Sequence, residues 1–295
     1  MAKIKSLVKR IIPYPWLRSY RELKSFNWRI TQIENQVKNK WLLENIPKIN
    51  DQKLAFRLNE FKIFSQTGED GIINYIFSKI GTKSKKFVEF GIQDGKECNT
   101  ANLSINFGWS GLLIEGDEDF ARKAKEYYSG KPVTVVNSFI TKDNINQIIS
   151  ENKIEGEIDL LVVDIDGNDY WVWKEINVIK PRVVVVEYNS ALGNKSITTK
   201  YKPDFERLKE HKNGLYFGAS LSAMTKLGKE KGYILVGCCS SGFNAFFIRK
   251  DLIKNKFSEM SPETVFYDDR GNVRKFGDLN KQFDKIKNLE FEQIE

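Results

Sequence analysis

A series of short apolar runs, each four to six residues long and rich in Val, Ile and Leu, most constrains what this chain can fold into. Polar or glycine residues follow each run, and stretches of helical length, such as 118–128 and 143–152, lie between them. Apolar runs that alternate with helices predict an α/β domain whose mostly parallel sheet is covered by helices on both faces. The five predicted strands are 87–90, 111–115, 133–136, 158–163 and 183–186.

Two further apolar runs, 233–237 and 245–248, follow a predicted helix at 220–231. The residues between the two runs are few enough for a hairpin, so we expect an antiparallel pair at the edge of the sheet. Residues 251–295 are charged and weakly periodic, and we expect them to form a peripheral C-terminal tail.

Composition excludes several classes of protein. Hydrophobic residues make up 41% of the 295 residues, enough for a sizeable core. No apolar run approaches the ~18 residues of a membrane span, and no signal-peptide pattern is present. The three cysteines favour a reducing, cytoplasmic compartment. With one histidine, His211, and three cysteines, neither a multi-histidine nor a four-cysteine zinc site can form.

The positive charge lies at the N-terminus. Residues 1–60 carry 13 Lys/Arg against 5 Asp/Glu, whereas the rest of the chain is balanced, which argues against a nucleic-acid partner. We expect residues 1–60 to form a helical extension. Two interpretations stay open: this extension packs on its own domain or on a second subunit of a homo-oligomer, or residues 1–45 contact the anionic inner surface of the membrane.

The first predicted strand leads into a glycine loop, from Gly91 to Gly95. The loop lacks the full dinucleotide fingerprint and the lysine of a P-loop, so neither ligand class is predicted. The second strand ends at Glu115, where a carboxylate can accept hydrogen bonds from two ribose hydroxyls. Together with the acidic Glu89, this pattern favours a nucleoside that carries a positive charge, such as S-adenosylmethionine.

Carboxylates follow the fourth and fifth strands. Asp164, Asp166 and Asp169 come directly after the fourth strand, and Glu187 and Asn189 end the fifth. If the two strands are neighbours, these oxygen donors converge and suit Mg²⁺ or Mn²⁺ rather than zinc. The alternative is that the Asp-Gly-Asn sequence forms a turn whose acids cap a helix.

These segments together resemble the FkbM-like S-adenosylmethionine-dependent methyltransferases over residues 61–250. The resemblance rests on five segments: 65–70 (SQTGED), 89–95 (EFGIQDG), 113–117 (LIEGD), 163–169 (VDIDGND) and 186–189 (VEYN). It implies a Rossmann-like class I fold with a seven-stranded sheet. It also implies O-methylation of a sugar that is nucleotide-activated or part of a surface glycan.

Position by position, the resemblance implies two sets of residues. The cofactor set is Gln66, Glu69, Glu89, Gly91, Gly95, Glu115, Gly116, Asn137 and Asp164. The metal set is Asp164, Asp166, Glu187 and Asn189, with Mn²⁺ or Mg²⁺ as the ion. The catalytic base stays open among Asp164, Asp169 and His211. Two other hypotheses for the whole protein also stay open: a metal-independent N- or carboxyl-methyltransferase, and a non-catalytic partner-binding or membrane-binding protein.

Overall fold

The computed structural model describes residues 51–295, which lie within one compact unit that begins at Lys48. The predictions for residues 1–50 therefore lie outside the described residues. Helix α3 (Gln52–Leu58) falls inside the expected N-terminal extension, yet it packs against strand β7 (Tyr233–Cys238). Its Phe56 ring lies so close to Gly237 that a Cβ there would approach the ring to 2.5 Å.

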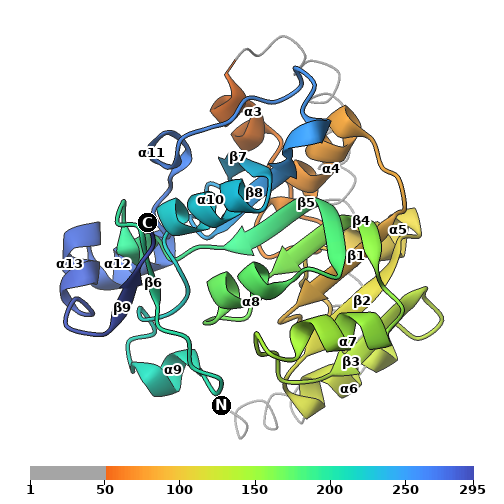
Figure 1. The fold of residues 1–295 in the computed structure, drawn as a ribbon, viewed down its shortest axis with the longest axis horizontal. Helices are drawn as coiled ribbons and strands as arrows, with labels where there is room; N and C mark the ends of the chain where they lie inside the picture. The colour runs from red at the N-terminus through yellow and green to blue at the C-terminus, as the bar shows by residue number, and fades with distance from the viewer. Residues whose placement is uncertain (1–50) are drawn as a thin grey trace, which may run out of the picture. The chain divides into compact units, whose positions relative to one another are not determined.

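A seven-stranded sheet forms the centre of the molecule, in the order β3-β2-β1-β4-β5-β8-β7 (Figure 1). Strands β1 to β5 are parallel, and β8 runs antiparallel to both β5 and β7. The prediction of a Rossmann-like sheet with an antiparallel edge pair is confirmed. The other strands are β1 (Lys86–Phe90), β2 (Ser110–Glu115), β3 (Val133–Asn137), β4 (Gly156–Val163), β5 (Ile179–Glu187) and β8 (Asn244–Arg249).

Helices cover both faces of this sheet, as adjacent residues of β8 illustrate. Phe246 points to one face, where its ring centroid lies 5.9 Å from that of Phe56. Phe247 points to the other face and lies 5.1 Å from Trp173 of α8. The remaining helices of this layer structure are α4 (Glu69–Ile80), α5 (Ala101–Phe107), α6 (Glu118–Tyr127), α7 (Ile145–Glu151), α8 (Asp169–Glu175) and α10 (Leu221–Glu230).

A second, small sheet joins two distant parts of the chain. Strand β6 (Ile197–Thr199) pairs antiparallel with β9 (Phe291–Gln293). Beside it, Phe205, Leu215 and Ile286 belong to a separate small apolar cluster. Residues 251–295, expected to form a peripheral tail, thus share a core with residues 191–217. They also contain the helices α11 (Pro262–Val265), α12 (Arg270–Phe276) and α13 (Leu279–Asp284).

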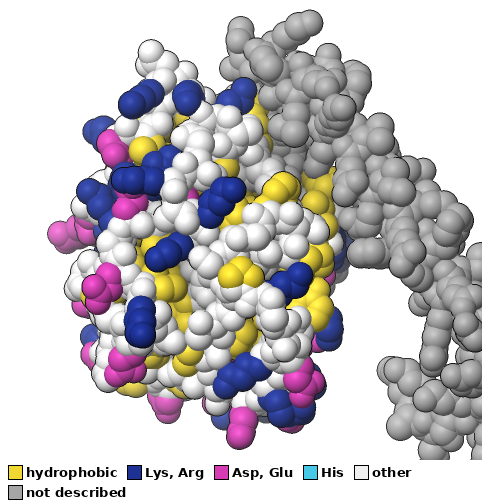
Figure 2. All heavy atoms as spheres, turned by 90° about the vertical axis from the view of Figure 1, so that its right-hand side faces the viewer, with side chains coloured by type: hydrophobic (Ala, Val, Ile, Leu, Met, Phe, Trp, Pro, Cys, Tyr) yellow, Lys and Arg dark blue, Asp and Glu magenta, His cyan; other side chains and the backbone are white. Residues whose placement is uncertain are grey.

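The surface of the described residues carries charges of both signs. On the face drawn in Figure 2, Lys and Arg side chains lie interspersed with Asp and Glu side chains. Within residues 51–295, none of the helices is both long enough and apolar enough to cross a bilayer.

The loops after β1 and β4 approach each other very closely. Gly91 follows β1 with a φ of +67°, and a Cβ on it would lie 1.9 Å from the carbonyl oxygen of Asp164. Only glycine fits here, because any side chain would collide with backbone that β4 holds in place. The glycine singled out in the sequence therefore sets the spacing between two loops.

We predict that Gly91→Ala destabilises the fold by about 3 kcal/mol or more, since it combines a positive φ with a backbone collision. Gly108→Ala is the matched control, because Gly108 has a φ of +66° and nothing within 4 Å of its Cβ position. Strain alone should cost this control about 1 kcal/mol. Chemical denaturation measures both variants, and equal losses would contradict the collision.

Candidate functional site

A cavity of about 430 Å³ opens at the carboxyl ends of the parallel strands. It lies where the strand order reverses, since β1 has β2 on one side and β4 on the other. Ligands of open α/β sheets bind at such a point. Residues after four strands and from a later segment line the cavity: Gly91, Gln93, Ile114, Glu115, Gly116, Asp117, Phe120, Ser138, Phe139, Ile140, Asp164, Ile165, Asp166, Asn168, Phe205 and Glu206.

Glu115 holds the loop after β1 in place at the cavity wall. Its Oε2 accepts a hydrogen bond from the Gln93 backbone N–H at 2.7 Å, and its Oε1 accepts one from Asp117 at 2.9 Å. Gln93 has a φ of +51°, an uncommon conformation for a residue with a side chain. A carboxylate has about four acceptor positions, so each Glu115 oxygen can still accept from a ligand.

Two aromatic side chains at this wall were not among the predicted residues. Phe120 and Phe139 both line the cavity and are 37% and 49% exposed. The predicted Asn137 does not line it, because its Nδ2 donates to the carbonyl oxygens of Glu115 and Gly116. The only sequence signal for Phe139 is its position, just after the end of a predicted strand at the edge where ligands bind.

Glu89 and Gly95 do not line the cavity, but each contacts the chain that follows β1. Glu89 is buried and accepts hydrogen bonds from the backbone N–H groups of Asn99 and Thr100 at 2.7 and 2.9 Å. Burial raises the pKa of this carboxyl. Gly95 packs against Tyr128, whose hydroxyl donates to the Gly95 carbonyl oxygen.

Gln66 and Glu69 also lie apart from the cavity lining. Gln66 is exposed. Glu69 is buried at the start of α4 and accepts hydrogen bonds from Thr67, Gly68 and Asn244. Burial raises the pKa of Glu69, but the hydrogen bonds lower it by more than burial raises it. The net shift of its pKa is therefore downward.

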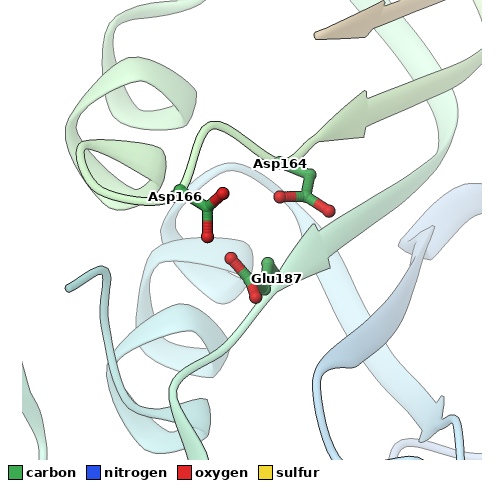
Figure 3. Close-up of side chains that lie close together, drawn as sticks. All are labelled: Asp164, Asp166 and Glu187. Atoms are coloured by element: carbon green, nitrogen blue, oxygen red, sulfur yellow. The ribbon is translucent and has the colours of Figure 1, made fainter. Parts of the chain in front are cut away.

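Three carboxylates gather at the ends of β4 and β5. Asp164, Asp166 and Glu187 each offer an oxygen, and these oxygens lie within 4.8 Å of one another (Figure 3). We call these three residues the carboxylate cluster. Within residues 51–295, no backbone N–H donates to any of their side chains, in contrast to Glu115 and Glu89. Of the five oxygen donors predicted to converge at these strand ends, these three do so.

Burial and mutual repulsion act on this cluster. Burial raises the pKa of Asp164 well above its ordinary value, and the neighbouring Asp166 raises it further. The pKa of Glu187 is raised in the same way, by burial and then by Asp164. Arg207 opposes this effect, since its Nη1 is ion-paired with Asp166 and lies 3.9 Å from Glu187 Oε1.

Asp169 and Asn189 hold loops in place and do not line the cavity. Asp169 is buried and accepts hydrogen bonds from the N–H groups of Ile165 and Gly167 at 2.8 and 2.9 Å. Burial raises its pKa to about 6 despite these bonds. The Asn189 amide oxygen accepts from Ala191, and its nitrogen donates to Leu215 and Phe217. Asn189 therefore does not point its oxygen at the cluster, as a metal ligand would.

His211 ends the short helix α9 (Arg207–Glu210) and does not line the cavity. Its Nδ1 lies 2.7 Å from Asn213 Oδ1, which also accepts from the Leu215 backbone N–H. The histidine thus takes part in a local turn in the segment that follows β6.

The carboxylate cluster fits a divalent cation by two criteria. Its donors are all hard oxygens, the type that Mg²⁺ and Mn²⁺ prefer. Glu187 Oε2 is buried, and within residues 51–295 no hydrogen-bond partner reaches it. A buried carboxylate oxygen without a partner is costly, and a bound cation would satisfy it.

No family model matches this chain, and no curated protein matches its sequence. Solved structures are similar to it at low identity. The N-terminal domain of EvdMO1 with SAH bound is 12% identical, with 63% of this chain and 80% of that chain covered and a TM-score of 0.40. An S-adenosylmethionine-dependent methyltransferase from Clostridium acetobutylicum is 12% identical, with 61% and 89% covered and a TM-score of 0.41.

A SAM-dependent methyltransferase from Aquifex aeolicus is 14% identical, with 60% of this chain and 89% of that chain covered and a TM-score of 0.36. These identities and TM-scores are too low to assign this chain to a family.

We predict that Phe139→Ala weakens binding of an adenine nucleoside to the cavity about tenfold. The reason is that stacking of a base on an aromatic ring contributes ~1–3 kcal/mol to the free energy of binding, which the variant would lose. Phe107→Ala is the matched control, since Phe107 is 54% exposed and does not line the cavity. Calorimetric titration with S-adenosylhomocysteine measures both. Equal affinity in the two variants would show that the ring does not contact the base.

Proposed function

We propose that this protein transfers a methyl group from S-adenosylmethionine to a hydroxyl of a sugar, with help from a divalent cation. The observation that carries the proposal is the arrangement along one cavity. Glu115 and two aromatic rings lie at the β2–β3 end, and Asp164 and Asp166 of the carboxylate cluster lie at the β4 end.

The β2–β3 end has the chemistry that a nucleoside requires. The free acceptor positions on Glu115 suit two vicinal ribose hydroxyls, and Phe120 and Phe139 suit the flat faces of a base. The volume of about 430 Å³ is in the range of small-molecule sites. The ligand would then extend past Gly91, where the absence of a side chain leaves room for it.

The β4 end suits the positively charged part of the cofactor and the acceptor hydroxyl. The carboxylate of Asp164, which lines the cavity, would attract a sulfonium and an amino group. In the transfer itself, the hydroxyl oxygen attacks the methyl carbon, and the carbon–sulfur bond breaks with its electrons left on sulfur. Most of the rate enhancement comes from holding oxygen, carbon and sulfur in line.

The hydroxyl proton needs an acceptor close to the cluster. In the absence of a cation, Asp164 is the best placed, because it lines the cavity and burial raises its pKa. With a divalent cation held by Asp164, Asp166 and Glu187, these carboxylates would act as its ligands and not as bases. The cation would instead lower the pKa of the acceptor hydroxyl, and the proton would pass to water. Asp169 supports this arrangement by fixing the loop that carries Asp166, whose φ is +54°.

We predict that Glu115→Ala weakens S-adenosylhomocysteine binding at least tenfold, since two charge-assisted hydrogen bonds of about 1.5–3 kcal/mol each are lost. Glu118→Ala is the control, because Glu118 is an exposed carboxylate three residues away that does not line this cavity. Calorimetry measures affinity, and a thermal melt checks that the variant folds. A folded Glu115→Ala protein with unchanged affinity would refute the assignment of the ribose site.

We also predict that Glu187→Ala abolishes methyl transfer but leaves S-adenosylhomocysteine affinity within about twofold, because Glu187 does not line the cofactor cavity. Excess EDTA should stop transfer by the unchanged protein, and Mn²⁺ or Mg²⁺ should restore it. Release of S-adenosylhomocysteine in the presence of nucleotide-activated sugars is the measurement, with the exposed Asp204→Ala as control. Full activity in EDTA would exclude the cation from the reaction.

A further inference from the structure

Arg207 is the cation that faces the carboxylate cluster. It begins helix α9, in a segment (residues 205–217) that we call the covering segment. Phe205 and Glu206 of this segment line the cofactor cavity, and the next residue reaches the cluster. The sequence alone does not reveal the contact of Arg207 with Asp166, because the two residues lie 41 positions apart.

Four contacts fix the guanidinium of Arg207. Its Nη1 pairs with Asp166 and lies 3.9 Å from Glu187 Oε1. Its Nε donates to the carbonyl oxygen of Gly214 at 2.7 Å, and its Cζ lies 3.5 Å from the centroid of the Phe217 ring. Asn189 in turn donates to the carbonyl oxygen of Phe217, so the end of β5 positions the ring beneath the arginine.

The charges around Arg207 do not balance. Within residues 51–295, it is the only cation paired with a carboxylate of the cluster, and it pairs with Asp166 and Glu187 but not with Asp164. Its side chain is 26% exposed and that of Asp166 is 60% exposed, so water screens this ion pair substantially, whereas Glu187 is only 11% exposed and is screened less. Burial lowers the pKa of Arg207, but the carboxylates of Glu187 and Asp166 raise it by more than burial lowers it. One fixed positive charge thus offsets part of the cluster's negative charge.

We propose that Arg207 is an internal counter-cation that competes with the divalent cation for the carboxylate cluster. This inference rests on the proposed function for the identity of the cation. Asp166, which pairs with Arg207 through Oδ1, is also one of the three residues that would hold a metal ion. A bound metal ion and the guanidinium also repel each other across a few ångströms of partly buried space. Arg207 is therefore a positioning residue that sets the affinity of the cluster for cations.

The same contacts couple the cluster to the covering segment. Gly214 and Phe217 lie in that segment, and both contact the guanidinium. A divalent cation held by Asp166 would compete with the ion pair of Arg207, whereas the stacking of Arg207 on Phe217 would not depend on Asp166. Cation binding would then weaken one of the interactions that hold the covering segment against the end of β4.

Binding of Mn²⁺ to the full-length protein tests the competition without any acceptor substrate. Arg207→Met removes the charge but keeps an apolar stem against Phe217, and we expect it to bind Mn²⁺ at least tenfold more tightly than the unchanged protein. Arg207→Lys keeps the charge and should change the affinity by less than threefold. Lys209→Met removes an exposed cation of the same helix and should leave the affinity unchanged.

Electron paramagnetic resonance of free Mn²⁺ gives the affinity, and a thermal melt checks folding. If Arg207→Met does not fold, Arg207→Gln carries the same test, because it is neutral and can still donate hydrogen bonds. Unchanged or weaker Mn²⁺ binding in a folded neutral variant overturns the inference.

The outcomes separate this inference from the proposed function. If Mn²⁺ binds to the neutral Arg207 variant but not to the unchanged protein, the competition is supported. The same result removes the cation from the reaction proposed for the unchanged protein. Binding by the unchanged protein that the neutral variant does not improve leaves the cation in place and refutes the competition. Absence of binding in both refutes both. Titration with S-adenosylhomocysteine judges the methyltransferase function independently.

Discussion

One kind of interaction fixes the loops around the cavity: a buried carboxylate accepts hydrogen bonds from two or more backbone N–H groups. Glu89 holds the residues before α5 in this way, Glu115 holds the loops after β1 and β2, and Asp169 holds the loop after β4. Each bond is charge-assisted, and so it can fix an uncommon backbone conformation such as those of Gln93 and Asp166.

The carboxylate cluster differs from these residues in having no such donors within residues 51–295. Burial and the neighbouring acids raise the pKa values of Asp164 and Glu187, whereas the donors around Glu69 outweigh its burial and lower its pKa. Donors do not outweigh burial everywhere, because the pKa values of Glu89 and Asp169 are raised although both accept backbone hydrogen bonds. The two groups of carboxylates are therefore distinguished by their backbone donors and not by the direction of the pKa shift. Those that accept backbone hydrogen bonds position the site, and those without donors remain available to a cation or a proton.

Much of the fold could be predicted from the sequence, because seven apolar runs marked the seven strands of the main sheet. The positions of Gly91, Glu115 and the cluster followed from the rule that parallel strands end at the same edge. The sequence could not show which acids would meet N–H groups, so Asp169 and Asn189 were assigned to chemistry although they hold loops. Nor could it place Arg207 beside Asp166, because that contact depends on how a long connection folds back.

The small sheet of β6 and β9 has a consequence for the order in which the molecule is completed. Strand β6 leads into the covering segment, and its partner β9 lies almost a hundred positions later, as the bond between Ser196 and Ile294 across 98 positions shows. On the ribosome, β1 to β5 emerge and can pair well before β9 is made. The part of the cavity between β1 and β3 can therefore form on a nascent chain, whereas the covering segment acquires its partner strand only after residues 291–293 have been made.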